Sequence, residues 1–255
     1  MIRRALIGHT GFVGSNLSSQ LVIDQKFNSQ NIREIEGQSF DEVICAGTPA
    51  AKWVANREPE YDQLNIERLS ASLKLISAKH FVLISTVDVY NKPNGLTEED
   101  IPDVINLQPY GKHRLAFERF VSEKFNSHSI VRLPALFGVG LKKNALFDLM
   151  TNNQTYNIIP NASYQWYPLR RLGSDLKIII RSNISLINVT SEPILMETIR
   201  SRFFPFARIA EPIPHPPNYD LRTKYASELG GENGYHLDAN TVLSEMNGFL
   251  NHSRS

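Results

Sequence analysis

The segment from Ala5 to Leu17 constrains the fold more strongly than any other part of the sequence. A short apolar run leads directly into glycines at positions 8, 11 and 14, and apolar residues at helical spacing follow. The chain holds 14 glycines in 255 residues, so a G-x-x-G-x-x-G pattern is expected by chance only about 0.04 times per chain. The pattern predicts a strand that turns sharply into a helix.

Each glycine of this turn has a distinct physical use. Gly8 lets the chain leave the strand, Gly11 leaves room for a pyrophosphate against the backbone, and Gly14 lets the helix pack close to the strand. The free amides at the start of a helix, together with its dipole, favour an anion. A glycine-rich turn without a ligand is the alternative. The residues predicted to bind a dinucleotide here are Gly8, Thr10, Gly11, Phe12, Val13 and Gly14.

Strand and helix patterns alternate along the first half of the chain. Apolar runs at 42–45, 81–84 and 129–133 are separated by helical periodicity over 61–78 and 111–125. This alternation predicts an α/β fold with a Rossmann-like, doubly wound parallel sheet. The loops at the carboxyl ends of such strands form the ligand crevice.

Composition excludes several classes of function. The 27 Lys and Arg residues nearly balance 26 Asp and Glu residues, giving a formal net charge of +1, so no overall basic field attracts nucleic acid or a membrane. The single cysteine, Cys45, allows neither an internal disulfide nor a cysteine-based metal site. It lies in an apolar run and is expected to be buried. The first residues lack the apolar core of a signal peptide, which predicts a cytoplasmic protein.

Three short motifs resemble one known family. Residues 10–14, Thr-Gly-Phe-Val-Gly, look like the cofactor turn of the extended short-chain dehydrogenase/reductases, the family of NAD-dependent epimerases and dehydratases. Residues 85–90 follow a Ser-Thr-x-x-Val-Tyr pattern, and residues 110–114 follow a Tyr-Gly-x-x-basic pattern. The resemblance implies that 1–140 form an NAD(P)-binding Rossmann domain. It also implies that 141–255 form a small C-terminal substrate-binding lobe, interleaved with the last elements of the main domain.

The same resemblance assigns the chemistry. Thr86 supplies a hydroxyl that polarises the substrate oxygen, and Tyr110 exchanges a proton with that oxygen. Arg114 stands where the family has a lysine. It shares a helix face with Tyr110, keeps the positive charge and cannot release a proton. His113 is either a surface residue or a substitute proton carrier.

The resemblance also implies further contacts. Cofactor contacts are expected, beyond the glycine turn, at Asn28, Ala46, Gly47, Ser85, Tyr110, Arg114 and Pro134. Substrate contacts are expected at Lys52, Asp88, Lys143 and Arg170. No residue is expected to bind a metal.

The residues after the second strand, expected at 22–27, bear on cofactor choice. Family members that prefer NAD usually carry an acid there, which binds the adenosine ribose. Asn28 and Ser29 take that place, and Arg33 is near enough to meet a 2′-phosphate. These residues favour NADP over NAD, whereas Asp24, earlier on the strand, keeps NAD open.

The family therefore implies an NAD(P)-dependent oxidoreductase, epimerase or reductase that acts on a nucleotide-activated sugar. Val87-Asp88 replace the Asp-Glu pair of similar 4,6-dehydratases, which favours reduction or epimerisation. A non-catalytic NAD(P)-binding protein that senses redox state is the main alternative, and a scaffold that binds no nucleotide is another. A homodimer is expected through the helices at 61–78 and 111–125. Neither nucleic acid nor membrane is expected as a partner.

Overall fold

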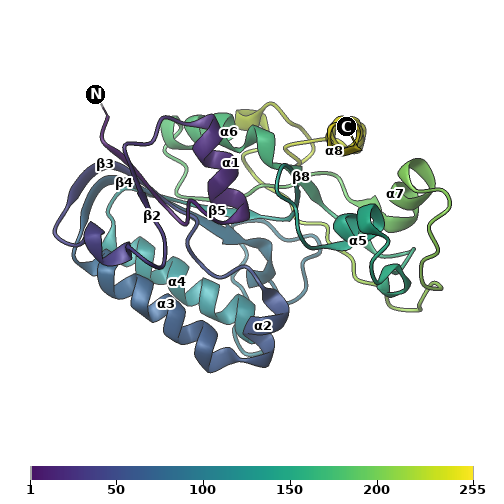
Figure 1. Cartoon of the computed structure of the whole chain (residues 1–255), viewed down its shortest axis with the longest axis horizontal. Helices are drawn as coiled ribbons and strands as arrows, with labels where there is room; N and C mark the ends of the chain where they lie inside the picture. The colour runs from purple at the N-terminus through teal and green to yellow at the C-terminus, as the bar shows by residue number, and fades with distance from the viewer. Residues whose placement is uncertain (1, 255) are drawn as a thin grey trace. The chain divides into compact units, whose positions relative to one another are not determined.

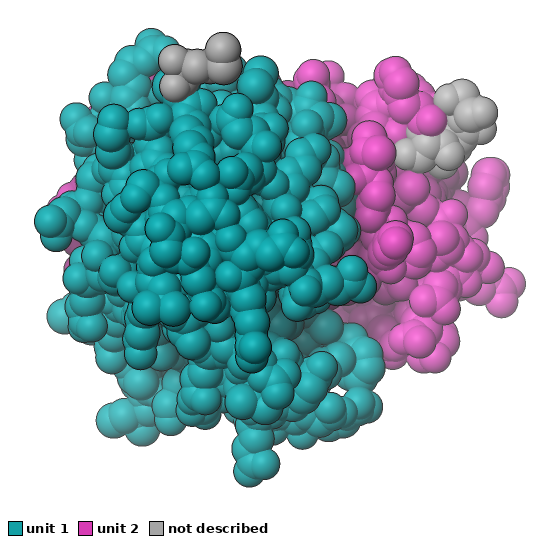
Figure 2. All heavy atoms as spheres, turned by 60° about the vertical axis from the view of Figure 1, so that its left-hand side comes forward, with its two compact units in different colours: residues 1–91, 100–132, 172–187 teal, residues 92–99, 133–171, 188–255 magenta. Residues whose placement is uncertain are grey.

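The computed structural model describes residues 2–254, which divide into two compact units. Unit 1 consists of residues 1–91, 100–132 and 172–187, and unit 2 consists of residues 92–99, 133–171 and 188–255. Figure 2 colours unit 1 teal and unit 2 magenta. Both units are therefore built from segments that are distant in sequence.

Unit 1 is built on a six-stranded parallel sheet with the strand order β2-β1-β3-β4-β5-β9. In register, Ile7 of β1 faces Phe27 of β2 on one side and Cys45 of β3 on the other. The predicted Rossmann-like, doubly wound sheet is confirmed. The strands are β1 (Arg4–Ile7), β2 (Gln25–Phe27), β3 (Ser39–Cys45), β4 (Ser77–Thr86), β5 (His128–Leu133) and β9 (Leu186–Asn188).

Helices cover both faces of this sheet, as Figure 1 shows. The long helices α3 (Pro59–Lys74) and α4 (Pro109–Lys124) lie side by side on one face, with the short α2 (Lys52–Arg57) next to them. The other face carries α1 (Phe12–Gln20) and α6 (Leu172–Arg181). A parallel sheet needs this cover because its strands are apolar on both faces.

The hydrophobic core between the sheet and α3 and α4 explains the apolar runs in the sequence. Alternate residues of β3 point to opposite faces, and Val43 and Cys45 belong to the cluster beneath α3 and α4. Cys45 is fully buried, as expected, and burial raises the pKa of its thiol to about 12. It is therefore an unreactive core residue.

The strand order reverses between β1 and β3, since β2 lies on one side of β1 and all later strands lie on the other. Ligands of doubly wound sheets bind at such a switch point, outside the carboxyl ends of the strands. The connection from β2 to β3 is short and contains only a 3₁₀ turn at Ile32–Ile35. The sheet consequently places the predicted glycine turn and the loop after β3 next to each other.

Unit 2 is less regular. Strand β6 (Ala135–Phe137) pairs in parallel with β8 (Trp166–Pro168), and β7 (Ser163–Tyr164) pairs antiparallel with β10 (Ile194–Leu195). The buried amide of Gln165 joins these segments, donating to the carbonyls of Ser191 and Leu221 at 2.6 and 2.8 Å. The helices of this unit are α5 (Ala145–Thr151), α7 (Met196–Phe203) and α8 (Ala239–Arg254).

A search of the helices within residues 2–254 found none with the length and apolar character needed to cross a bilayer.

Candidate active site

The glycine turn after β1 has the conformation that its sequence predicts. Gly8 has φ +83°, and its amide donates to the carbonyl of Phe27 at 2.7 Å. The amide of Gly11 donates to the carbonyl of Gly8 at 3.0 Å. A Cβ atom at position 14 would lie 2.1 Å from that same carbonyl oxygen. Only glycine therefore lets α1 pack this closely against the end of β1.

The N-terminus of α1 is open to an anion. Gly11 is the N-cap, and within the described residues no side chain caps the helix and no acid occupies its first turn. Thr10 and Gly11 are exposed. A Cβ at Gly8 would lie 2.3 Å from the carbonyl oxygen of Ala46, so the loop of Ala46 and Gly47 adjoins the turn. The structure thus gathers these predicted cofactor residues at the switch point of the sheet.

Asn28 follows β2 directly and forms a tight turn with its neighbours. Its Oδ1 accepts from the amide of Gln30 at 2.8 Å, and its own amide donates to Asn31 Oδ1 at 2.7 Å. Asp24 lies at the opposite, amino end of β2, where it accepts from the amide of Arg4 at 2.7 Å. Asp24 is therefore far along the strand from the end where a ribose binds in this class of sheet.

Thr86 and Tyr110 meet at the carboxyl end of β4. The Thr86 side chain lies close enough to the Tyr110 hydroxyl to lower its pKa, and Thr86 Oγ1 accepts from the amide of Asp88 at 3.1 Å. Tyr110 begins α4, and its amide donates to Asn56 Oδ1 at 3.0 Å. A Cβ at Gly111 would lie 2.1 Å from the carbonyl oxygen of Asp88, so glycine brings the helix onto this loop.

Arg114 lies one turn beyond Tyr110, as predicted, and is buried. Its guanidinium makes a bidentate ion pair with Asp62 of α3 and also donates to the carbonyl of Pro49. Its carbon Cζ lies 3.9 Å from the centroid of the Tyr110 ring. His113 Nδ1 is 2.8 Å from Asp62 as well. Asp62 therefore organises both basic residues of this helix face.

Electrostatics act on the tyrosine in opposite directions. Burial raises the pKa of Tyr110 above its usual range, Arg114 opposes this shift, and Asp88 adds to it. Burial by itself would raise the pKa of Asp62, but hydrogen bonds from Arg114 and His113 outweigh it and leave that pKa lowered. Asp62 is thus ionised, and its charge compensates Arg114.

A second buried network lies behind the strand end. The hydroxyl of Ser85 donates to Glu118 of α4 at 2.5 Å, and Arg132 of β5 makes a bidentate ion pair with the same carboxylate at 2.6–3.2 Å. Arg132 also donates to the hydroxyl of Tyr90 at 2.7 Å. This network fixes Ser85, a predicted cofactor contact, beside Thr86.

The comparisons with known proteins rest on structure. No family model matches the chain, and no curated protein matches its sequence. Among solved structures, a dTDP-4-dehydrorhamnose reductase from Clostridium acetobutylicum ATCC 824 superposes with a TM-score of 0.78 at 16% identity, over 100% of both chains.

Two further solved structures superpose over most of the chain. MoeE5, in complex with UDP-glucose and NAD, has a TM-score of 0.74 at 17% identity, over 99% of this chain and 100% of that one. A UDP-N-acetylglucosamine 4-epimerase from Methanobrevibacter ruminantium M1 has a TM-score of 0.70 at 14% identity, over 91% and 92%. The fold is that of the extended short-chain dehydrogenase/reductases. The resemblance seen in the three motifs is confirmed at the level of the fold.

Within this fold, Lys52 and Asp88 form an ion pair at 2.8 Å. Lys52 opens α2, and Asp88 lies in the 3₁₀ turn Val87–Val89 after β4. Their side chains are 47% and 20% exposed, so the pair is accessible. The structure therefore brings two predicted substrate residues together, close to Tyr110.

The remaining predicted residues belong to unit 2. Pro134 follows β5 and is half-buried, and Lys143 is exposed before α5. The Arg170 side chain is 73% exposed, and its Nε donates to Glu245 at 2.6 Å. These residues stay predictions for the substrate and cofactor.

Sequence reasoning missed Asp62 and Glu118. Both carboxylates lie within long helical patterns, where a charged residue usually faces solvent. Their partners are 52 and 14 positions away in the chain, so neither pair has a local signal. The one signal in the sequence was an acidic residue on the apolar face of each helix, where a buried carboxylate requires a partner.

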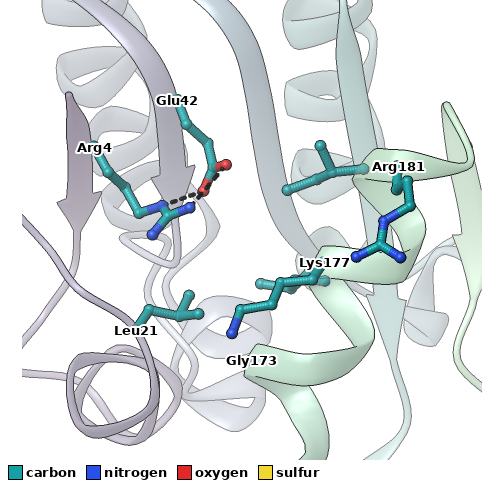
Figure 3. Close-up of a pocket in the computed structure, with 8 residues that line it drawn as sticks. Arg4, Leu21, Glu42, Gly173, Lys177 and Arg181 are labelled. Carbon is teal, nitrogen blue, oxygen red and sulfur yellow. Dashed lines mark hydrogen bonds and ion pairs between the residues drawn. The ribbon is translucent and has the colours of Figure 1, made fainter. Parts of the chain in front are cut away.

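A separate cavity, shown in Figure 3, lies near the amino ends of the strands. The glycine turn lies at the other end of β1. The Arg4–Glu42 ion pair, 2.5 Å long, borders it from β1 and β3. Lys177 and Arg181 reach it from α6. It takes no part in the candidate active site. A search for clusters of metal-ligating side chains across residues 2–254 found none.

Proposed function

We propose that this chain is an NAD(P)-dependent oxidoreductase that acts on a nucleotide-activated sugar, with Tyr110 as its general acid or base. The observation that carries the proposal is the close approach of Thr86 to Tyr110, whose pKa the Thr86 side chain lowers. It pairs two hydroxyls at the carboxyl end of β4, the edge of the sheet that also carries the open N-terminus of α1. Solved reductases, epimerases and dehydratases of nucleotide sugars share the fold.

The residues of unit 1 fit a dinucleotide. Gly8 and Gly14 let the turn pack closely between β1 and α1. No side chain of the described residues caps the start of α1, so its first-turn amides are available to a pyrophosphate. Ala46, Gly47 and Ser85 lie after or at the ends of neighbouring strands. A bound nicotinamide dinucleotide supplies or accepts the hydride in this chemistry.

We favour NADP as the cofactor. Asn28 follows β2 where NAD-binding sheets of this class carry an acid. Asp24, which would support NAD, is bound to the amide of Arg4 at the other end of the strand. Arg33 is exposed on the 3₁₀ turn nearby, where its guanidinium is available to bind a 2′-phosphate.

The chain's own residues divide the work. Thr86 donates its hydroxyl to the substrate oxygen, and Tyr110 gives that oxygen a proton or takes one from it. Arg114 packs against the face of the Tyr110 ring and so helps to fix its position. For the substrate, we retain Lys52 and Asp88 of unit 1 as contacts.

Two proposals concern unit 2 and assembly. Lys143 and Arg170 are exposed cations suited to a diphosphate, and we propose unit 2 as the substrate-binding lobe. Tyr61 and Leu64 are 58% and 42% exposed on the outer face of α3. Such apolar exposure on a long helix supports a homodimer through α3 and α4.

A redox-sensing protein without catalysis remains the second candidate. The burial of Arg114 in an ion pair with Asp62 favours it, because the charge of the cation next to the tyrosine is already paired. Calorimetric titration with NADPH, NADP⁺, NADH and NAD⁺, followed by assays of absorbance at 340 nm with a panel of nucleotide sugars, decides between the two. Binding with turnover supports the enzyme, and binding without turnover supports the sensor. Absence of all dinucleotide binding would refute both.

A further inference from the structure

The pocket of about 160 Å³ near the amino ends of the strands, here called the amino-end pocket, has no role in the candidate active site. Arg4 of β1 and Glu42 of β3 form one side of it, and Lys177 and Arg181 of α6 reach it from the other side, as Figure 3 shows. All four residues belong to unit 1. The length of β1 separates the pocket from the glycine turn, so the same sheet carries a second concave site.

The sheet side of the amino-end pocket is fixed and electrically neutral. Arg4 donates from Nε and Nη2 to the carboxylate of Glu42 at 2.5 and 3.2 Å, and its Nη1 donates to the carbonyl of Val22 at 3.0 Å. The side chains of the ion pair are only 16% and 11% exposed. Glu42 therefore has its counter-charge without any contribution from α6.

The α6 side of the pocket carries two cations without a counter-charge. Lys177 and Arg181 are four positions apart, so they lie on the same face of the helix. Both are exposed, and within residues 2–254 neither side chain forms an ion pair or a hydrogen bond. Like charges at this spacing repel each other. With Arg4 and Glu42, the lining holds three cations and one carboxylate, a formal charge of +2.

Apolar side chains and close helix packing shape the rest of the pocket. Leu176 is 1% exposed, Ile180 is partly buried, and Leu21 follows the end of α1. The amide of Gly173 in α6 donates to Oε1 of Gln20 in α1 at 2.7 Å, and a Cβ at Gly173 would lie 2.8 Å from the Gln20 Cβ. The position of α6 is thus set by its packing on α1, and the pocket exists without a ligand.

We propose that the amino-end pocket binds the phosphate group of a small ligand. A phosphate dianion matches the formal charge of the lining, and its oxygens accept hydrogen bonds from the Lys177 ammonium and the Arg181 guanidinium together. The volume of about 160 Å³ accommodates one phosphate group and a few carbon atoms. The apolar wall of Leu176 and Ile180 suits those carbon atoms. The inference is independent of the proposed function, because neither a dinucleotide nor a sugar takes part in it.

Nuclear magnetic resonance of protein labelled with ¹³C at the isoleucine δ1 methyl groups tests the proposal at the pocket itself. The Ile180 signal is assigned as the one lost in the Ile180→Val protein. We titrate inorganic phosphate at constant ionic strength and about pH 8, where phosphate is mostly a dianion. We expect a saturable shift of the Ile180 signal with a Kd below about 1 mM. The absence of a saturable shift up to about 20 mM phosphate would overturn the proposal, as would binding that leaves Ile180 unmoved.

A double variant tests the two cations of α6. Lys177→Gln/Arg181→Gln removes both charges and keeps long side chains with good helix propensity. We expect its Kd for phosphate to be at least about 10-fold higher than that of the wild type. A Kd within about twofold of the wild-type value would contradict the proposal. The wild-type titration decides the question even where the variant does not fold.

Arg68→Gln/Lys74→Gln is the matched control. It removes the same charge from two exposed positions of α3, on the other face of the sheet. Because these positions do not line the pocket and salt screens distant charges, we expect the Kd for phosphate to stay within about twofold of the wild-type value. An equal loss of affinity in this control would mean that overall charge, and not the pocket, attracts phosphate.

Two further compounds identify the group that the pocket recognises. Ethyl phosphate offers the same dianion with two carbon atoms for the apolar wall. Tighter binding of ethyl phosphate than of inorganic phosphate identifies a phosphate monoester as the ligand, and equal or weaker binding identifies free phosphate, so both results support a phosphate site. Succinate carries its two charges on carboxylates, and tighter binding of succinate than of either phosphate compound would refute the assignment.

Discussion

The backbone of Asp88 and the α-carbon of Gly111 touch, since a Cβ at position 111 would lie only 2.1 Å from the Asp88 carbonyl oxygen. This contact sets the start of α4 against the turn after β4, and so it places Tyr110 beside Thr86. The hydroxyls of Thr86 and Tyr110 can come this close only because residue 111 has no side chain.

Replacing Gly111 by alanine should therefore displace the start of α4 and separate Tyr110 from Thr86. We expect kcat to fall by about 100-fold, as small displacements of catalytic groups typically do. The folded state should survive, because the helix can shift towards solvent at its end. Steady-state kinetics and circular dichroism measure the two effects. Gly248→Ala in α8, where the added Cβ meets open space, should leave kcat unchanged. A comparable loss of kcat in this control would mean that the effect at Gly111 does not come from its contact with Asp88.

Gly11→Ala probes the dinucleotide turn. The added Cβ lies 3.3 Å from the carbonyl oxygen of Gly8, a contact that the turn can accommodate. It occupies the surface where a pyrophosphate would approach the backbone, so we expect dinucleotide affinity to fall at least about 10-fold with the fold intact. Calorimetric titration measures the change. Undiminished affinity in the folded variant would place the cofactor elsewhere.

The buried ion pair of Glu118 and Arg132 should dominate stability near the site. Glu118→Gln leaves Arg132 buried without a counter-charge, which we expect to cost about 3–5 kcal/mol. Replacing both residues by apolar ones, Glu118→Leu/Arg132→Met, should recover most of this loss. Urea denaturation gives both values. Equal stability of the single and the double variant would contradict this explanation, because the unpaired charge of Arg132 would then not be the cause of the loss.

Asp62 gives the protein a specific acid sensitivity. Because its pKa is lower in the folded state than in the unfolded chain, its contribution is fully present above the unfolded value, about 4, and is lost as pH falls further. The stability difference between wild type and Asp62→Asn should therefore be nearly constant above about pH 5 and shrink as the pH falls from about 4 to about 2. Urea midpoints across this range test the sign. Glu67→Gln, an exposed site on the same helix, should show a nearly constant difference, and a growing Asp62 difference at low pH would be inconsistent with its ion pair.

Local pattern was sufficient to predict the parts of the fold and site that depend on neighbouring residues. The glycine turn, the strand end at Thr86 and the helix face shared by Tyr110 and Arg114 are all short-range relations. The strand predicted at 81–84 was too short, because β4 begins at Ser77 and its first half is only partly buried. Polar residues there interrupt the apolar run without interrupting the strand.

The electrostatic setting of the site could not be predicted in the same way. The contact of Arg114 with a cofactor stays a prediction, but its hydrogen bonds to Asp62 and to main-chain carbonyls were not predicted. The partner lies on another helix, and only the packing of α3 against α4 brings the two residues together. An ion pair between two helices that are far apart in the sequence produces no periodic pattern from which it could be predicted.

The most direct test of the central claim is the rate of nicotinamide oxidation by the Tyr110→Phe protein with a keto sugar nucleotide. We expect the rate to fall by about 10²–10⁴-fold, the range for loss of a general acid, while dinucleotide affinity stays within about twofold of wild type. Tyr61→Phe, an exposed tyrosine on α3, should react at the wild-type rate. Turnover by Tyr110→Phe at the wild-type rate would contradict the account.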